Sequence, residues 1–287
     1  MRVLYINSHS ADYVQDLTYS GLVKVLGLKS VVDYHWNKKY HIHYKKYPKD
    51  LGYTKGSFFP SIFNRNIKDV DAVILGASKV DCFETYIEIV DEISPGIPII
   101  FVDGGDQSEI GKDLTIYERP ELFEQAVSKR PFDFIFKREY LLEIKHENNV
   151  YPFPMSYNLD RMPGPLEGKK YDVSFWAVES YPIRTQALKL LEDKFDCKRN
   201  GTETNQQFSQ YKRKGLFYLQ ELAQCKIVLN FRGGGWDTIR YWEVPAMSTF
   251  MISQKSQIFI PNNFVDKESI VFCKDDLRIL WTCVHII

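Results

Sequence analysis

The segment that decides the fold is Asn230–Glu243, which reads NFRGGGWDTIRYWE. An apolar run, Lys226–Phe231, leads directly into three consecutive glycines, and a polar turn then leads into a stretch with helical spacing. This order predicts a buried strand, a close-fitting loop and the start of a helix. Glycine lets the main chain take a positive φ or approach a ligand closely, and the unpaired N–H groups of a helix N-terminus suit a phosphate. The segment therefore predicts an anion-binding turn.

Charged side chains flank this turn on both sides. Arg232 and Arg240 carry fixed positive charges on forked donors, which are well suited to a diphosphate. Glu243 follows Arg240 by one helical turn, so its carboxylate either accepts the hydroxyls of a ribose or pairs with Arg240. Asp237 or Thr238 is a candidate helix cap that would satisfy the N–H groups internally. A glycine loop followed by a solvated ion pair is the alternative reading.

The segment resembles the C-terminal domain of GT-B glycosyltransferases, above all the CgeB-like and exostosin-like groups. Their motif is an apolar strand ending in Asn, a variable loop and Thr/Ser-x-Arg-x-x-Glu-x-x-Ala-x-Gly; Thr238, Arg240 and Glu243 match it, and Ser248 replaces the final glycine. The resemblance also covers Asp172–Arg184. It implies that the Arg and Glu face the diphosphate and ribose of a sugar donor. The residues expected to bind the donor are Arg184, Asn230, Arg232, Gly233, Gly234, Gly235, Trp236, Asp237, Thr238, Arg240 and Glu243.

The rest of the chain alternates short apolar runs with amphipathic stretches. Uninterrupted apolar runs separated by helices indicate parallel sheets covered on both faces. A proline-rich stretch begins at Tyr151–Ser156 and is expected to be a linker, because proline continues neither a helix nor a central strand. We therefore expect an α/β protein with two Rossmann-like domains, GT-B-like, facing across a cleft: residues 1–155 on the acceptor side and 156–287 on the nucleotide-sugar side. The second domain is expected to be short, and the chain is either naturally short or truncated.

Polar residues follow the strands expected in the first domain. In open α/β sheets, ligands bind at the carboxyl ends of the strands. Asp103 and Asp106 lie in the loop after the run Ile97–Val102, beside two glycines, and His9 follows the first strand. A carboxylate of raised pKa or a histidine can take a proton from an acceptor hydroxyl. These three residues are the catalytic candidates, and a helix-capping or solvent-facing role is the alternative for each.

Composition limits the classes of partner. Lys+Arg and Asp+Glu each number 37, so the formal net charge is zero. A chain without excess charge has no overall electrostatic reason to bind nucleic acid, and no nucleic-acid partner is expected, although a local basic patch stays open. Five scattered cysteines and no long apolar run predict a cytoplasmic protein without an integral membrane segment. Neither the lysine- and tyrosine-rich stretch Trp36–Tyr53 nor any other segment completes a metal site.

These observations favour a glycosyltransferase that moves a sugar from a nucleoside-diphosphate sugar to a glycan, protein or small molecule. Arginines would stabilise the leaving diphosphate, so we expect neither a metal nor a cofactor, with the nucleotide sugar as co-substrate. A second hypothesis is an inactive transferase-like module that binds a nucleotide or sugar in an assembly or coat. A third is a sugar-phosphate epimerase, which is disfavoured because no Gly-x-Gly-x-x-Gly follows the first strand.

Overall fold

A computed structural model describes residues 1–58, 66–163, 168–174, 179–191 and 215–278, together with 280 and 282. The chain divides into two compact units, Met1–Asn158 (unit 1) and Leu159–Ile287 (unit 2). Each unit is built around its own parallel sheet. Because the predicted apolar runs form the buried strands of both sheets, the expected α/β class with two parallel sheets is confirmed.

Unit 1 contains a six-stranded sheet in the order β2-β1-β3-β4-β5-β6, and every neighbouring pair is parallel. The residues of β1 and β3 are all buried, as expected for strands covered on both faces. The strands are β1 (Val3–Ile6), β2 (Val31–Tyr34), β3 (Ala72–Leu75), β4 (Ile99–Asp103), β5 (Phe134–Lys137) and β6 (Val150–Pro152).

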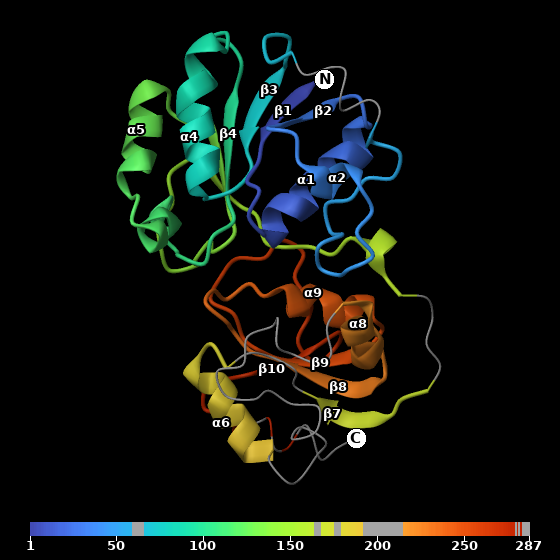
Figure 1. Cartoon of the computed structure of the whole chain (residues 1–287). Coiled ribbons are helices and arrows are strands. Elements are labelled where there is room, and N and C mark those ends of the chain that lie inside the picture. Colours follow the sequence, from blue (N-terminus) through green and yellow to red (C-terminus); the bar gives the residue numbers. More distant parts are fainter. Residues whose placement is uncertain are drawn as a thin grey trace. The chain divides into compact units, whose positions relative to one another are not determined.

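Helices cover both faces of this sheet. In Figure 1, α1 and α2 lie on one face, and α4 and α5 lie on the other. On the second face, Phe83 and Tyr86 of α4 and Leu122 of α5 join the core formed with the strands. The helices are α1 (Tyr13–Leu26), α2 (Lys38–His41), α4 (Val80–Ile89) and α5 (Glu121–Lys129), with short 3-10 helices η1 (Val90–Glu92) and η2 (Lys112–Tyr117).

The order of the strands places a candidate ligand edge in unit 1. The chain runs from β1 outward to β2 and then returns to β3 on the other side of β1. At such a switch point, the loops after the two central strands lead away from each other and leave room for a ligand. The strands themselves are in close contact there: a Cβ on Gly76, just after β3, would lie 2.5 Å from the ring of Tyr5. Only glycine fits at this position.

Unit 2 contains a four-stranded parallel sheet in the order β10-β9-β8-β7. Ile183 and Leu191 of α6 share a core with Ile227 and Leu229 of β8, while α8 and α9 pack on the opposite face (Figure 1). The elements are η3 (Leu159–Arg161), β7 (Tyr171–Ser174), α6 (Pro182–Leu191), α8 (Leu216–Ala223), β8 (Cys225–Asn230), α9 (Ile239–Ala246), β9 (Phe250–Gln254) and β10 (Val271–Cys273).

One sequence-based expectation fails in unit 1. Tyr151 and Pro152, the first residues of the predicted linker, belong to the edge strand β6, which pairs only with β5. An edge strand tolerates proline because the missing N–H group faces away from the sheet. Here the prolines accompany the edge strand of the sheet. Unit 1 ends several residues later, at Asn158.

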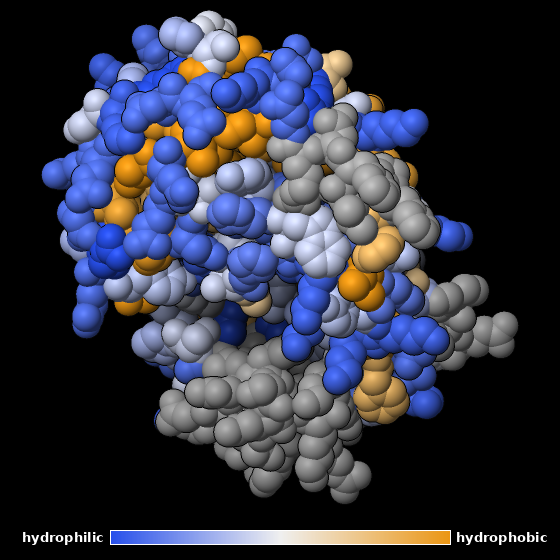
Figure 2. Space-filling view, turned by 45° about the horizontal axis from the view of Figure 1, so that its top comes forward, coloured by the Kyte–Doolittle hydropathy of each residue, from blue (hydrophilic) through white to orange (hydrophobic). Residues whose placement is uncertain are grey.

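On the face drawn in Figure 2, hydrophilic side chains cover most of the coloured surface, and apolar side chains show between them. Within the described ranges, no helix is both long and apolar enough to span a bilayer. The same ranges contain no group of three or more His, Cys, Asp or Glu side chains arranged to hold a metal ion.

Candidate functional site

The loop after β8 is held in place by its own polar side chains. Asn230, the last residue of β8, donates from Nδ2 to Ser253 Oγ at 3.0 Å and accepts from Thr238 Oγ1 at 2.7 Å. Thr238 is the N-cap of α9, but its hydroxyl is used in this contact and makes no capping hydrogen bond. The two side chains thus tie the start of α9 to the end of β8. This bridge fixes the path of the glycine loop between them.

Arg184 reaches this loop from the first turn of α6. Its Nε donates to the carbonyl of Arg232 at 2.8 Å, and its Nη2 donates to the carbonyl of Phe231 at 2.9 Å. The side chain is 7% exposed. Arg184 comes from a different part of the chain, yet the fold brings it into direct contact with the residues that the sequence singled out.

A second guanidinium group lies close to the first. Arg240 of α9 is 8% exposed. Burial and, after it, the positive charge of Arg240 lower the pKa of Arg184 to about 9. Two cations that repel each other in a poorly solvated place carry an electrostatic cost. A bound anion would remove that cost, so this pair is the strongest electrostatic feature of the loop.

Arg232 forms a three-layer stack with two aromatic rings. Its guanidinium carbon lies 4.2 Å from the ring centre of Tyr181 and 4.2 Å from that of Trp236. Its main-chain N–H donates to Gln254 Oε1 at 3.0 Å. Cation–π contacts of this kind hold the charged plane in one orientation. The third predicted arginine is therefore part of the same loop and is held rigidly.

None of the three glycines has a positive φ; in the described chain, glycines with positive φ lie elsewhere. A Cβ on Gly233 would lie 3.1 Å from Arg184 Nη2, so a side chain there would press on the guanidinium group. The main chain of Gly233 also donates to the carbonyl of Gly235 at 3.0 Å. Gly234 contributes a carbonyl that accepts from Arg232 Nη2 at 3.4 Å.

Glu243 lies deeper than the sequence suggested. Glu243 is only 1% exposed, and its Oε2 accepts a hydrogen bond from the hydroxyl of Tyr218 at 3.1 Å. Burial raises the pKa of Glu243 to about 8. The neighbouring Asp237 is also buried and accepts from Trp242 Nε1 at 2.9 Å. Glu243 thus links α9 to α8, and Asp237 links the turn before α9 to the helix itself.

In unit 1, Asp103 is fully buried in an ion pair. Its Oδ2 lies 2.9 Å from Nζ of Lys137, which is also fully buried. Asp103 also accepts from Ser78 Oγ at 2.6 Å and from the N–H of Gly111 at 3.0 Å. These contacts occupy both carboxylate oxygens and connect β3, β4 and β5. The structure therefore gives Asp103 a structural contribution that explains its position without catalysis.

Asp106 is more accessible, with a side chain 51% exposed. It forms an ion pair with Arg138, whose guanidinium group also contacts Glu139 Oε1 at 3.2 Å and the carbonyl of Gly104 at 2.9 Å. The loop is held from inside by Asp113, which accepts from the N–H of Asp106 at 2.9 Å. Asp106 is thus a half-exposed carboxylate at the carboxyl edge of the sheet.

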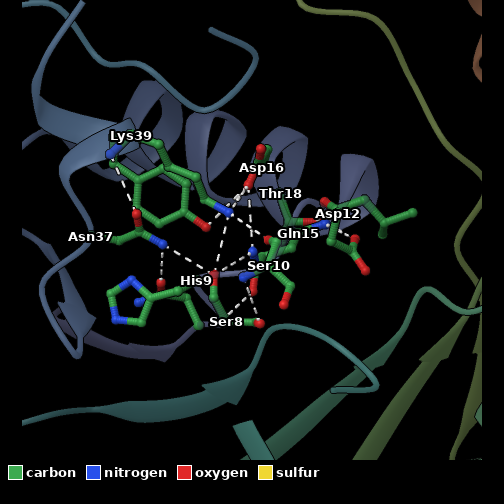
Figure 3. Close-up of polar contacts among 12 residues, drawn as sticks. Ser8, His9, Ser10, Asp12, Gln15, Asp16, Thr18, Asn37 and Lys39 are labelled. Carbon is green, nitrogen blue, oxygen red and sulfur yellow. Dashed lines mark hydrogen bonds and ion pairs between the residues drawn. The ribbon is translucent and has the colours of Figure 1, made fainter. Parts of the chain in front are cut away.

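His9 is exposed at the same edge, directly after β1. Its main-chain N–H donates to Asp81 Oδ2 at 3.1 Å, and the same oxygen accepts from Ser8 Oγ at 2.9 Å. Figure 3 shows His9 beside a network in which the carbonyl of Ser8 accepts from Gln15 and Asn37. The main chain that carries His9 is therefore fixed, and its ring faces solvent.

Unit 1 contains further charged groups that the sequence did not reveal. Lys39 Nζ lies 2.8 Å from Asp16 Oδ1, and both side chains are largely buried (Figure 3). Burial raises the pKa of Asp16 to about 6. Asp12 caps α1 by accepting from the N–H of Gln15, and burial raises the pKa of Asp12 as well. The Lys39–Asp16 pair joins α2 to α1, whereas the N-cap contact of Asp12 lies within the start of α1.

Sequence reasoning also missed the aromatic partners of unit 2. Tyr181 and Tyr218 contact Arg232 and Glu243 from segments that lie far from the glycine loop in the chain. The only available signal was the position of Tyr181, shortly before Arg184 in the stretch that carries the family resemblance. Long-range pairing of this kind has no local sequence pattern.

No protein-family model and no curated protein sequence matches the chain. Among solved structures, the chain is similar to an α-glucosyltransferase in complex with UDP and a 13-mer DNA containing a central A:G mismatch. The identity is 12%, the TM-score is 0.59, and the match covers 100% of this chain and 89% of that one. A second α-glucosyltransferase complex, with UDP and a 13-mer DNA containing an HMU base, matches with 11% identity, a TM-score of 0.59 and coverages of 100% and 90%.

The glycosyltransferase SnogD from Streptomyces nogalater matches with 11% identity, a TM-score of 0.44 and coverages of 92% and 84%. The two α-glucosyltransferase structures, each with a TM-score of 0.59, are the ones that show the fold. The chain has a GT-B-like two-domain fold, similar to that of nucleotide-sugar glycosyltransferases. At this level of identity the likeness concerns the fold, and activity has to be argued from the site.

Proposed function

We propose that the chain is a glycosyltransferase that takes a sugar from a nucleoside-diphosphate sugar, and that unit 2 binds the diphosphate at the loop between β8 and α9. The observation that carries this proposal is the pair of largely buried, mutually repelling guanidinium groups of Arg184 and Arg240 beside that loop. A diphosphate would replace repulsion by charge-assisted hydrogen bonds.

The same groups suit the chemistry of transfer. As the bond between sugar and diphosphate breaks, negative charge develops on the leaving diphosphate. Fixed cations and the N–H groups at the start of α9 stabilise that charge without reorganising. Arg232, which is stacked between two rings, supplies a third oriented cation. Gly233 leaves the space in which Arg184 lies against the loop.

The predicted contact of Glu243 with a ribose needs a local change. The hydroxyl of Tyr218 currently donates to its carboxyl group, which is almost fully buried. Ribose hydroxyls would have to take the place of the Tyr218 hydroxyl. On unit 1, Asp106 and His9 are the candidates exposed enough to receive a proton from an acceptor hydroxyl. Asp103 is left out of the proposal because its ion pair encloses it.

The first test is nucleotide binding by the intact chain. UDP is the first ligand to measure because the similar α-glucosyltransferase complexes contain it. We expect UDP to raise the melting temperature and Arg240→Ala to weaken UDP binding by roughly tenfold or more, since a hydrogen bond to a charged group contributes about 1.5–3 kcal/mol. The matched control is Arg278→Ala, which removes the same charge from a side chain that is 86% exposed.

Two outcomes contradict the donor-site assignment. One is the absence of any thermal shift with uridine or guanosine diphosphates and their sugars. The other is an equal loss of binding in both arginine variants. If UDP binds but no UDP is released from UDP-sugars with or without acceptors, the chain is a nucleotide-binding module of transferase-like fold, and the enzymatic part of the proposal is wrong.

A further inference from the structure

Charge is distributed unevenly over unit 1. Residues 13–58, which include α1, β2 and α2, contain eight lysines and three aspartates and have no arginine or glutamate. All three aspartates are buried, and seven of the eight lysines are exposed. The exposed charged side chains of this segment are thus all positive. They are Lys24, Lys29, Lys38, Lys45, Lys46, Lys49 and Lys55, here called the lysine surface.

The aspartates are already engaged inside the unit. Asp16 pairs with Lys39 at 2.8 Å, and Asp33 Oδ2 lies 3.0 Å from His41 Nε2. Asp50 accepts from the main-chain N–H of Tyr44 at 2.7 Å. These carboxylates therefore do not neutralise the lysine surface. Across the described part of the chain, Lys29, Lys38, Lys45, Lys46, Lys49 and Lys55 form no ion pair.

The main chain beneath the lysines is well anchored. The carbonyl of Tyr40 accepts from the N–H of Thr54 at 2.9 Å and from Ser57 Oγ at 3.1 Å. Ser57 Oγ also lies 2.9 Å from Nδ1 of the buried His41. Buried Tyr40 stacks on Tyr19 of α1, with ring centres 3.9 Å apart. The lysines are consequently presented on a fixed base rather than on a free loop.

The lysine surface is extended. Asn37, just before α2, donates to the carbonyl of Ser8 at 3.0 Å, so Lys38 lies near the start of α1. Lys24 lies in the last turn of α1, and Lys29 follows the end of this helix. A helix of 14 residues is about 21 Å long. That length matches several successive phosphates of a nucleic-acid strand, which are spaced about 3.4 Å apart along the duplex axis.

The opposite face of the sheet has the reverse charge. Residues 80–129, which include α4 and α5, contain twelve acidic and three basic residues. Glu84 and Glu88 of α4 and Asp91 and Glu92 of η1 are exposed there. The zero net charge of the chain therefore conceals segments of opposite charge, with an excess of basic residues in 13–58 and an excess of acidic residues in 80–129. Zero net charge therefore does not exclude nucleic-acid binding, because a polyanion interacts with the local charge of the surface that it approaches.

We propose that the lysine surface of unit 1 binds the phosphate backbone of nucleic acid. A lipid surface fits less well, because the three large apolar side chains exposed in residues 13–58, Val25, Ile42 and Phe58, lie far apart in the sequence and share no helix, whereas the exposed lysines number seven. Combined with the proposed sugar transfer, this surface makes nucleic acid the acceptor class. Binding itself is measured without a donor, so the two proposals fail separately.

The test is binding of a fluorescent 20-base-pair DNA duplex to the full chain, followed by anisotropy between about 50 and 200 mM salt. The variant is Lys45→Gln/Lys46→Gln/Lys49→Gln. The matched control, Lys68→Gln/Lys112→Gln/Lys145→Gln, removes the same charge from exposed lysines outside the segment. Each lost phosphate contact lowers the slope of log affinity against log salt by about 1. We expect the variant to lose roughly three units of slope and more than tenfold in affinity at low salt, and the control to stay near the parent protein.

Parallel measurements keep the result interpretable. Thermal melting with and without UDP shows whether the variant is folded and whether the diphosphate site is intact. Vesicles of phosphatidylglycerol and phosphatidylcholine test the lipid alternative. The proposal is overturned if the parent protein does not bind duplex or single-stranded DNA at low salt, if variant and control lose affinity equally, or if the variant loses vesicle binding while DNA binding is unchanged.

Discussion

The carboxyl edges of the two sheets differ in how their charged side chains are paired. In unit 1, three cations near the edge face a carboxylate: Lys137 pairs with Asp103, Arg138 with Asp106, and Lys39 with Asp16. In unit 2, the charged group that most affects Arg184 is another cation, Arg240. Opposite charges placed together stabilise a fold without a ligand, whereas like charges placed together need one. The difference supports structural work for the first edge and favours the anion binding proposed for the second.

The largest effect expected from this contrast is on the stability of unit 1. Asp103→Ala leaves Lys137 as an uncompensated buried charge, which costs about 3–5 kcal/mol in the free energy of unfolding. Urea denaturation measures it. Replacing both partners, by Asp103→Leu with Lys137→Met, is expected to cost less than the single substitution because no buried charge remains. A loss below about 1 kcal/mol for Asp103→Ala would show that this edge does not depend on its ion pairs.

A smaller effect concerns the pH dependence of stability, which we expect to differ between the two units. The pKa of Glu243 is raised from 4.5 to about 8, so the folded state holds a proton that the unfolded state has lost. The stabilisation is complete below the unfolded pKa and is lost as pH rises through the folded pKa, with a slope of at most about 1.4 kcal/mol per pH unit. We expect stability to fall by up to about 3 kcal/mol between pH 6 and 8 and Glu243→Gln to remove this fall.

Unit 1 provides the contrast for that measurement. The pKa of Asp16 is raised from 3.8 to about 6, so its contribution is lost as pH rises from about 4 to about 6, and Asp16→Asn is expected to change only this acidic part of the profile. Denaturant titrations at successive pH values, with each variant compared with its parent, separate the two windows. A Glu243→Gln profile parallel to that of the parent from pH 6 to 8 would contradict the buried, protonated carboxyl group.

The smallest effect concerns backbone conformation. Both units contain non-glycine residues at positive φ: Glu118 in unit 1 has φ 57°, and Ser248 in unit 2, after α9, has φ 54°. A side chain in this conformation costs roughly 1 kcal/mol, so Ser248→Gly is expected to raise the free energy of unfolding by about 0.5–1 kcal/mol. Thermal melting measures the gain. A destabilised variant would indicate that the serine side chain contributes more than its strain costs.

This position also shows how far the sequence alone could lead. The family motif has glycine where Ser248 stands, and the structure supplies the reason, a left-handed residue after the helix. The sequence predicts that a helix starts within Asn230–Glu243, and α9 begins there at Ile239, because a polar turn marks its start. The strand β8 and its loop were equally readable from their uninterrupted apolar run.

Other features were not accessible from local patterns. β6 was missed because its proline suggested a linker, and an edge strand can be recognised only once its neighbour is known. Asp103 looked like a free loop carboxylate, since its partner Lys137 lies 34 residues later. The burial of Glu243 depends on Tyr218 from α8. Pairing and burial are set by tertiary contacts, whereas a single sequence reports mainly periodicity and turn chemistry.

The reversed charge of the two faces of unit 1 has a consequence at long range. A sheet with lysines outside one layer of helices and carboxylates outside the other is an electric dipole, whatever the net charge of the chain. In the field of a polyanion such a body experiences a torque as well as a force. The molecule would turn its lysine surface toward the nucleic acid before the first contact. Even a protein without net charge would then arrive in a preferred orientation.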